Sequence, residues 1–141
     1  MSYIQRIRDQ GRDANPFFSL MDIEVEAIGT GAGSLRMPVR PDMMNGEDWM
    51  QGGIFTALAD EAMVLAVYSL LDPDDRIATI TETTTFIAGT RGGTLYARGS
   101  VIKQGRRVAF AEGEVRQDEP AGRLLSRSTA AFAVLKTANH A

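Results

Sequence analysis

Two adjacent carboxylates, Asp60 and Glu61, stand in the middle of a strongly apolar segment of the chain. They are the only charged residues between Gly52 and Leu71, and apolar side chains occupy nearly every face of the helix that this segment predicts. A carboxylate held in a buried helix is costly unless it is paired or functional. A functional carboxylate in such a place can act as a general base or as a nucleophile.

Of the two acids, we take Asp60 as the candidate catalytic group. Adjacent helical residues point about 100° apart, so one acid can face the core while the other leans toward the rim or a partner. The alternative is that Asp60 is a buried structural acid, hydrogen-bonded to a hydroxyl such as that of Thr79.

The pair Gly52–Gly53 lies where this helix should begin. The first backbone N–H groups of a helix have no partner within the helix, and glycine lets another molecule approach them closely. The helix dipole favours an incoming negative charge or oxyanion at this end. The alternative is that the two glycines only accommodate a tight turn.

The spacing between these two groups has a geometric consequence. Asp60 follows Gly52 by eight residues, which is roughly 12 Å along a helix axis. One reacting carbonyl cannot touch both groups in the same subunit. If both serve one site, Gly52 of one chain must face Asp60 of another across a twofold axis, and the protein is a homodimer.

Composition narrows the chemistry that is available. The chain of 141 residues has no cysteine, and its one histidine is His140, next to the C-terminus. Thiol nucleophiles, histidine catalysis and metal sites built on these residues are therefore disfavoured. A net charge of -3 gives no reason to expect nucleic acid or an anionic membrane as partner. The N-terminus lacks the apolar region of a signal peptide, which predicts a cytoplasmic protein.

The remaining segments predict one domain of α+β class, in which a long central helix is wrapped by a curved antiparallel sheet. A short helix is expected at 3–11 and a frayed C-terminus at 137–141. Thr79, Thr81, Thr83 and Thr85 are expected on one face of the third strand. The strands are expected at Phe17–Ile28, Ser34–Val39, Ile77–Ile87, Thr94–Lys103, Arg107–Gln117 and Arg123–Leu135.

Two segments carry a resemblance to a known family. NGEDWMQGGIFTALAD, from Asn45 to Asp60, resembles the N-G-x-x-x-x-H-G-G-x-x-x-x-L-x-D signature of hotdog-fold acyl-CoA thioesterases. The match is to their PaaI-like and 4-hydroxybenzoyl-CoA thioesterase branch. KQGRRVAF, from Lys103 to Phe110, is similar to that family's K-x-G-[KR]-x-x-A-F strand-turn-strand.

The resemblance implies hydrolysis of acyl-CoA thioesters, either aromatic ones such as phenylacetyl-CoA or medium-chain ones. It implies that Asp60 is the catalytic carboxylate and that the Gly52 N–H polarises the thioester carbonyl. Asn45 would help to hold water or that carbonyl, and Thr79 would position water near Asp60. No separate cofactor and no metal are expected, because coenzyme A is part of the substrate.

The resemblance also extends to substrate binding and assembly. Gln51 and Gly53, on either side of Gly52, are expected to bind substrate. Lys103, Arg106 and Arg107 are candidates for binding the coenzyme A nucleotide, but ordinary exposed charges at a β-turn are the simpler explanation of these three residues. The acyl pocket is expected to use Trp49, Met50, Phe55 and Met63. A homodimer is expected, with dimers pairing further into a tetramer.

One departure from the family pattern concerns Gln51, which stands where the signature has histidine. Glutamine still donates and accepts hydrogen bonds, so the alternative function is a non-catalytic protein that binds acyl-CoA or another small ligand. Hotdog-fold hydratases fit poorly, because they use a catalytic histidine beside an acid.

Overall fold

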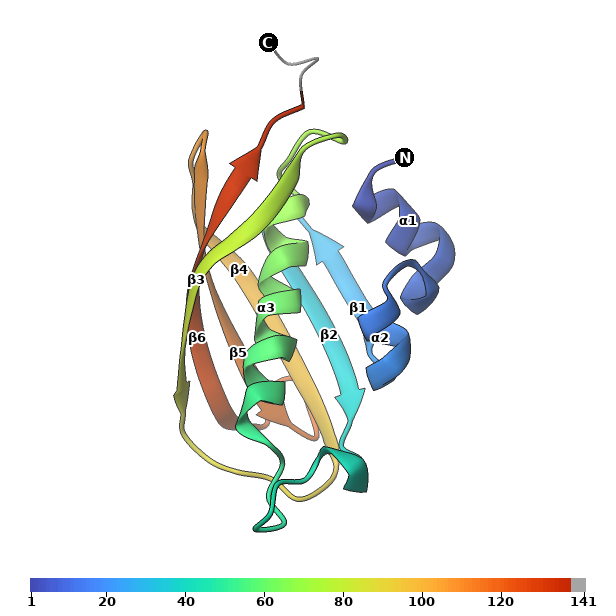
Figure 1. Ribbon diagram of the computed structural model, residues 1–141, viewed down its shortest axis with the longest axis vertical. Helices are drawn as coiled ribbons and strands as arrows, with labels where there is room; N and C mark the ends of the chain where they lie inside the picture. The colour runs from blue at the N-terminus through green and yellow to red at the C-terminus, as the bar shows by residue number, and fades with distance from the viewer. Residues whose placement is uncertain (138–141) are drawn as a thin grey trace.

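The computed structural model confirms the predicted arrangement of one long helix and a curved antiparallel sheet (Figure 1). It describes residues 1–137. The six strands follow the order β1-β2-β4-β5-β6-β3, so β1 and β3 form the two edges. The elements are α1 (Tyr3–Gln10), η1 (Gly11–Ala14), α2 (Pro16–Met21), β1 (Glu24–Gly29), β2 (Ala32–Pro38), η2 (Pro41–Met43), α3 (Gly52–Tyr68), β3 (Arg76–Phe86), β4 (Thr94–Gln104), β5 (Val108–Gln117) and β6 (Arg123–Leu135).

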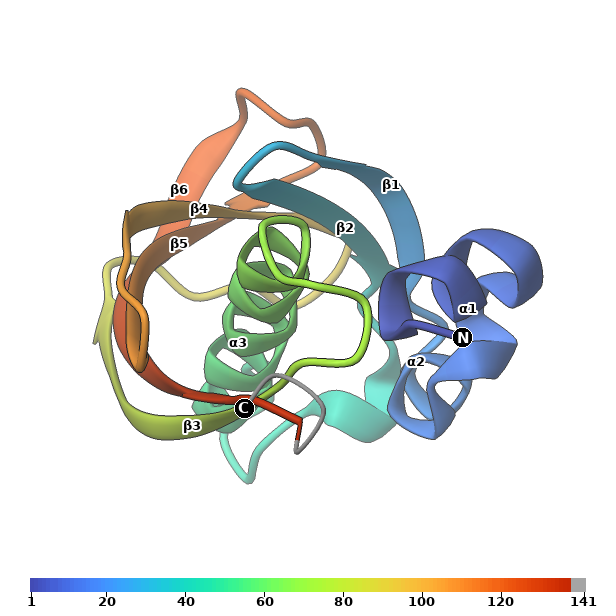
Figure 2. The same cartoon turned by 90° about the horizontal axis from the view of Figure 1, so that it is seen from above.

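Helix α3 is the core of the molecule. From Ile54 to Ser69 every residue is buried or half-buried, as expected for a helix whose sequence is apolar nearly all round. Figure 2 looks along α3 and shows the sheet curving around it, with α1 and α2 at the β1 side and β3 at the other side. The half-buried face of α3 carries Asp60, Glu61 and Val64.

A row of glycines lets the helix lie close to the sheet. Gly33, Gly99 and Gly113 stand opposite one another on β2, β4 and β5. A Cβ on Gly99 would lie 2.5 Å from the backbone of Ala62 and Met63, and one on Gly33 would lie 2.8 Å from Leu65 Cβ. A side chain on Gly33 or Gly99 would push α3 away, so these two glycines fix the depth of the helix in the sheet.

A bulge in β3 places its threonines on both faces of the strand, contrary to the prediction. The register between β3 and β6 shifts between Thr79 and Thr81. Thr79 bonds to α3 before the bulge, and Thr84 bonds to α3 after it. The expected single face of Thr79, Thr81, Thr83 and Thr85 is therefore wrong, because the extra residue of a bulge exchanges the two faces of a strand.

The N-terminal part of the predicted first strand is instead the short helix α2. Asn15 caps it by accepting hydrogen bonds from the N–H groups of Phe17 and Phe18, and Pro16 occupies its first turn. Both are helix-start signals. Asp22 then ends the helix in the left-handed conformation, with φ of 56°. The strand β1 begins only at Glu24.

The other predicted strands are confirmed to within two residues at each end. The short N-terminal helix is confirmed as well. Of the predicted frayed segment, residues 138–141, including His140, lie outside the described part of the chain. Within residues 1–137, no helix has the length and apolar character needed to span a bilayer.

Candidate active site

The predicted carboxylate lies against the predicted hydroxyl. Thr79 Oγ1 on β3 donates a hydrogen bond of 3.2 Å to Asp60 Oδ1 on α3. Asp60 is the middle residue of the helix, on its half-buried face. The hydrogen bond holds one carboxylate oxygen and leaves the other available to water or substrate.

Burial changes the acidity of this group. Desolvation raises the pKa of Asp60, and the Thr79 hydrogen bond lowers it in part. A carboxylate with a raised pKa is a stronger base than an exposed one, which suits proton abstraction near neutral pH. The predicted contact between Asp60 and Thr79 is present, as expected either for a catalytic carboxylate or for a structural acid.

Two further acids, Glu61 and Glu82, lie in the electrostatic field of Asp60. Burial first, and the Asp60 charge second, raise the pKa of Glu61 to about 7. The same two causes raise the pKa of Glu82 to about 7, with a Ser128 hydrogen bond in opposition. Three acids therefore share one partly buried region between α3 and β3.

Sequence reasoning assigned no role to Glu82. The prediction that Thr79, Thr81, Thr83 and Thr85 share one face implied that Glu82 lies on the other face of the strand. The bulge reverses this assignment and leaves Glu82 half-buried beneath α3. A bulge in a threonine-rich strand has no reliable sequence signal, so this acid could not have been identified earlier.

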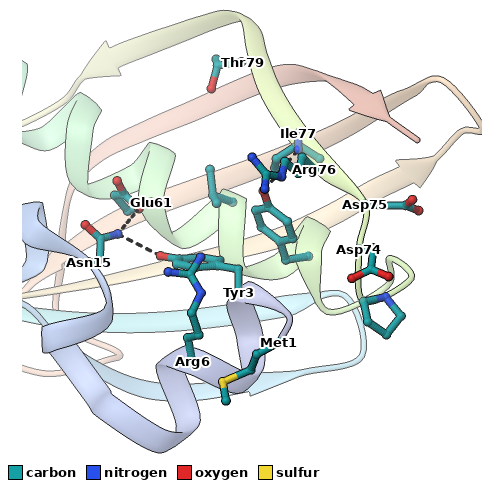
Figure 3. A pocket seen from close by; sticks show the side chains of 13 residues that line it. Met1, Tyr3, Arg6, Asn15, Glu61, Asp74, Asp75, Arg76, Ile77 and Thr79 are labelled. Carbon is teal, nitrogen blue, oxygen red and sulfur yellow. Dashed lines mark hydrogen bonds between the residues drawn. The ribbon is translucent and has the colours of Figure 1, made fainter. Parts of the chain in front are cut away.

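Glu61 belongs to a small hydrogen-bonded cluster with Tyr3 and Asn15. Asn15 Nδ2 lies 2.9 Å from the Tyr3 hydroxyl and 3.5 Å from Glu61 Oε2. Figure 3 shows these three side chains on one wall of a cavity of about 400 Å³. Thr79, the hydrogen-bond partner of Asp60, lines the same cavity.

The other end of α3 holds the predicted oxyanion site. Gln51 is the helix N-cap, and its side-chain oxygen accepts a hydrogen bond from the Gly53 N–H. Within residues 1–137 the structure gives the Gly52 N–H no hydrogen-bond partner. Gln51 and Gly53 are thus brought together, and Gly52 is the residue of this turn that can donate to a ligand.

Asn45 holds the turn that precedes the helix. Its side-chain oxygen accepts hydrogen bonds from the N–H groups of Glu47 and Trp49, at 2.9 and 3.1 Å. Its backbone N–H donates to the Trp49 carbonyl at 2.7 Å. The side-chain oxygen therefore shapes the turn, and only the amide Nδ2 remains to contact water or a substrate carbonyl.

The basic residues lie away from Gly52 within one subunit. Lys103, Arg106 and Arg107 are exposed at and beside the β4–β5 turn, the orange hairpin of Figure 1, at the end of the molecule where α3 finishes. Gly52 is at the opposite end of that helix. One molecule does not bring the predicted nucleotide-binding residues and the predicted oxyanion site together.

Three of the four residues expected in the acyl pocket are packed in the core. Met50, Phe55 and Met63 are each at most 3% exposed, and none lines the cavity beside Glu61. Trp49 is 42% exposed, and the central guanidinium carbon of Arg91 lies 3.8 Å from the centre of the Trp49 ring. In one subunit, the cavity that reaches the Asp60 region is therefore built from α1, α3 and β3 instead.

The structure also bears on metal binding. No group of three His, Cys, Asp or Glu side chains in the described chain is arranged to hold a metal ion. The acids around Asp60 are linked by electrostatics and by hydrogen bonds to hydroxyl and amide groups.

Known proteins with a similar sequence or structure are described as esterases or thioesterases. A protein of Thermoplasma acidophilum described as a candidate esterase is 24% identical over 89% of this chain and 98% of its own length. A thioesterase family protein from Silicibacter pomeroyi superposes with a TM-score of 0.85 at 22% identity, over 96% of this chain and 99% of the other.

A candidate thioesterase from Ralstonia eutropha, related to phenylacetic acid degradation, has a TM-score of 0.84 at 21% identity, over 93% of this chain and 98% of its own. At these identities the two solved structures establish the fold alone, which is the hotdog fold. The model of the thioesterase superfamily matches residues 50–122, just over half of the chain, from the turn before α3 to the β5–β6 loop. The chain therefore belongs to the thioesterase superfamily.

Proposed function

We propose that this protein hydrolyses acyl-CoA thioesters to a free acid and coenzyme A. The observation that carries the proposal is that Asp60, a half-buried carboxylate on α3, accepts a hydrogen bond from Thr79 at one oxygen, while its second oxygen has no hydrogen-bond partner within residues 1–137. A half-buried carboxylate without a cationic partner is costly to keep, and Thr79 orients it without neutralising it. Membership of the thioesterase superfamily makes a thioester the natural substrate for such a base.

The active site is proposed to need two subunits. Gly52 and Asp60 are eight residues apart on one straight helix, roughly 12 Å along its axis. The β3 edge of the sheet exposes Ile80 and Phe86, at 55% and 56%, and is paired only with β6 in the described chain. An exposed edge strand with apolar side chains is suited to association with a second copy.

In this homodimer, the thioester carbonyl oxygen accepts a hydrogen bond from the Gly52 N–H of one subunit. Asp60 of the other subunit takes a proton from water, whose oxygen attacks the carbonyl carbon. The carbon–sulfur bond then breaks, and the coenzyme A sulfur leaves with the proton returned by Asp60. The Gly52 N–H stabilises the oxyanion that forms between these two steps.

A second route uses the same groups. Asp60 attacks the carbonyl carbon directly, coenzyme A leaves, and water hydrolyses the resulting mixed anhydride. A single turnover in ¹⁸O-labelled water distinguishes the routes by mass. In the first route the label enters only the product acid, and in the second, water attack at the Asp60 carbonyl of the anhydride places it in the protein.

Coenzyme A binding is proposed to involve Lys103, Arg106 and Arg107. Their exposed cationic side chains can pair with the nucleotide phosphates at little desolvation cost. Association of two subunits would allow the basic hairpin and the oxyanion site to serve one ligand. Pairing of dimers into a tetramer is a further expectation, to be measured with the oligomeric state.

The decisive experiment measures thiol release from a panel of acyl-CoAs by the wild type and by Asp60→Asn. The chain contains no cysteine, so a thiol reagent reports only released coenzyme A. The proposal predicts turnover by the wild type and its loss in the folded variant. If the folded wild type binds acyl-CoA but releases no thiol from any of them, the chain is a binding protein and the proposal fails.

A further inference from the structure

The inner face of β3 runs along helix α3. Because of the bulge, this face carries Thr79, then Glu82 and then Thr84. Thr79 bonds to Asp60, and Thr84 bonds to Thr56, which lies about one turn earlier on α3. Glu82 therefore lies between these two contacts and faces the helix from the strand. Its neighbours across the sheet on β6 are buried residues: Ser128, Ala130 and Phe132.

Three hydroxyl groups form a chain that ends at Glu82. Thr56 Oγ1 donates to Thr84 Oγ1 at 2.9 Å, and Thr84 Oγ1 lies 2.9 Å from Ser128 Oγ. Ser128 in turn is hydrogen-bonded to the Glu82 carboxyl group. Because an ionised carboxylate can only accept and each hydroxyl has one proton, every donor in the chain then points toward Glu82. The chain therefore orients this carboxyl group and favours its ionised form.

One oxygen of the Glu82 carboxyl group is left unused by this chain. Oε2 is buried and accepts no hydrogen bond within residues 1–137. A buried carboxyl oxygen without a donor is costly in the ionised state. Burial and the charge of Asp60 raise the pKa of Glu82 to about 7, although the Ser128 hydrogen bond lowers it in part. Glu82 therefore changes its charge near neutral pH.

Asp60 is the charged group that acts on Glu82. Strand β3 packs against α3 and pairs with β6. Helix α3 has one other charged residue, Glu61, whose carboxyl group faces Asn15. The basic residues of the two strands are exposed: Arg76 on β3, and Arg123 and Arg127 on β6. Within residues 1–137, no cation is paired with Asp60 or Glu82, so the two acids meet as like charges.

We propose that Glu82 is a positioning residue for the hydrolysis: oriented by the hydroxyl chain, its carboxylate places a second negative charge near Asp60 and makes Asp60 a stronger base toward the attacking water. The inference rests on the proposed thioesterase function. A neighbouring like charge increases the proton affinity of a carboxylate, and a stronger base takes the water proton more readily. Glu82 acts through Asp60 and needs no contact with the substrate.

The proposal predicts two steps in the dependence of kcat/KM on pH. Activity appears as Asp60 ionises, and a further increase of about threefold is expected near pH 7, where Glu82 ionises and Asp60 becomes more basic. Glu61 also has a pKa of about 7 in the field of Asp60 and would add a step of its own. The profile is therefore measured in Glu61→Gln, in which Glu82 is the remaining acid beside Asp60.

Variants in this background assign the second step. The double variant Glu61→Gln/Glu82→Gln should lose it. Ser128→Ala removes the donor to Glu82, so the step should remain but move to higher pH. Glu119→Gln, in the exposed β5–β6 loop, is the matched control and should keep the step in place. A purely structural role of Glu82 would lower kcat/KM at all pH values and leave the shape of the profile unchanged.

Titration of Glu82 itself needs no activity. Carbon-13 NMR of labelled carboxyl groups should place its midpoint near pH 7 in Glu61→Gln. Asp60→Asn removes the neighbouring negative charge and should lower this midpoint, whereas Ser128→Ala should raise it. A midpoint that Asp60→Asn leaves unchanged would show that the two carboxyl groups do not interact, and the inference would be wrong.

The kinetic results separate this inference from the proposed function. If the protein hydrolyses thioesters but the double variant keeps the step near pH 7, the thioesterase proposal stands and the role of Glu82 is wrong. The same holds if Glu61→Gln shows no second step. If the wild type hydrolyses no thioester, the proposed function fails, and Glu82 has no reaction to assist.

Discussion

Asp60 and Glu61 are neighbours in the chain, yet their carboxyl groups have different partners. Asp60 accepts a hydrogen bond from Thr79 on β3, whereas Glu61 faces Asn15 and Tyr3 from the N-terminal segment. The helical turn separates the two side chains by about 100°. The two carboxyl groups therefore have different surroundings on the same half-buried face of α3.

The hydrogen bond between Thr79 and Asp60 predicts a graded series of activities. Asp60→Asn should lower kcat by about a thousandfold or more, the scale of a lost general base. Thr79→Val, which lacks only the hydroxyl, should lower kcat by roughly tenfold, because Asp60 remains but is less well oriented. Steady-state kinetics on the best acyl-CoA substrate measures both effects.

Thr79→Ser is the control for this series. It retains a hydroxyl within reach of Asp60 and should keep at least about a third of the wild-type kcat. If Thr79→Val were as active as the wild type, the hydrogen bond would have no part in catalysis. Circular dichroism of each variant establishes that the fold is retained.

The raised pKa values predict that stability falls as pH rises toward neutrality. Glu61 and Glu82 each have a pKa of about 7 in the folded chain against 4.5 in the unfolded chain. The folded state therefore binds more protons than the unfolded state between about pH 4.5 and 7, and the free energy of unfolding decreases across this interval. Urea unfolding at pH 5.5 and pH 8 measures the difference.

Glu61→Gln and Glu82→Gln should each flatten this dependence. Each neutral amide removes one group that must ionise in a partly buried place, so each variant should gain on the order of 1 kcal/mol relative to the wild type at pH 8. At pH 5.5 the gain should be smaller, and below about pH 4.5 it should vanish. Glu119→Gln should leave the pH profile unchanged, and a wild-type stability that rose from pH 5.5 to pH 8 would contradict the assignment.

The row of glycines under α3 predicts that alanine lowers the stability of the protein at Gly99 but not at Gly92. Gly99→Ala places a Cβ 2.5 Å from the helix backbone at Ala62 and Met63, and overpacking at a core position costs about 1–3 kcal/mol or more. Gly92→Ala, where no atom lies within 4 Å, should change the free energy of unfolding by less than about 0.5 kcal/mol. Equal stabilities of the two variants would refute a packing role for the row.

The sequence predicted the fold well because its strongest signals are local. The apolar run around Asp60, the β-branched strand from Ile77 and the glycine turns each determine an element by periodicity or by a break. The segment after Asn15 was misassigned because alternating polar residues resemble a strand, while the capping side chain of Asn15 and the proline favour a helix.

The candidate site was predictable on helix α3 and at Thr79 of the following strand. The pattern of the helix identified Asp60 and Gly52 as candidate site residues, and the following strand supplied Thr79 as a hydroxyl near Asp60. The cluster of Tyr3, Asn15 and Glu61 joins residues up to 58 positions apart. Such a contact depends on how the N-terminal helices pack on α3, and no local pattern encodes that packing.

The shared active site predicts that two inactive proteins can restore each other. Gly52→Pro removes the N–H proposed to bind the oxyanion, at the first helical position, where proline is well tolerated. Gln51 precedes it with φ -61° and ψ 129°, a conformation that proline permits in the residue before it. Gly52→Pro and Asp60→Asn should each be inactive as homodimers.

When equal amounts of the two variants are unfolded together and refolded, half of the dimers should contain one of each. Each such dimer has one intact site, formed by Gly52 of one subunit and Asp60 of the other, so activity should return to about a quarter of the wild-type value. If both groups served one site within a single chain, every chain would carry a lesion and the mixture would stay inactive. Gly52→Ala is the control, because it keeps the N–H but adds a Cβ that would lie 3.2 Å from the Phe86 ring, as the proline Cβ also would. If Gly52→Ala is active, Gly52→Pro fails because it lacks the N–H. If Gly52→Ala is inactive, crowding against Phe86 explains the loss.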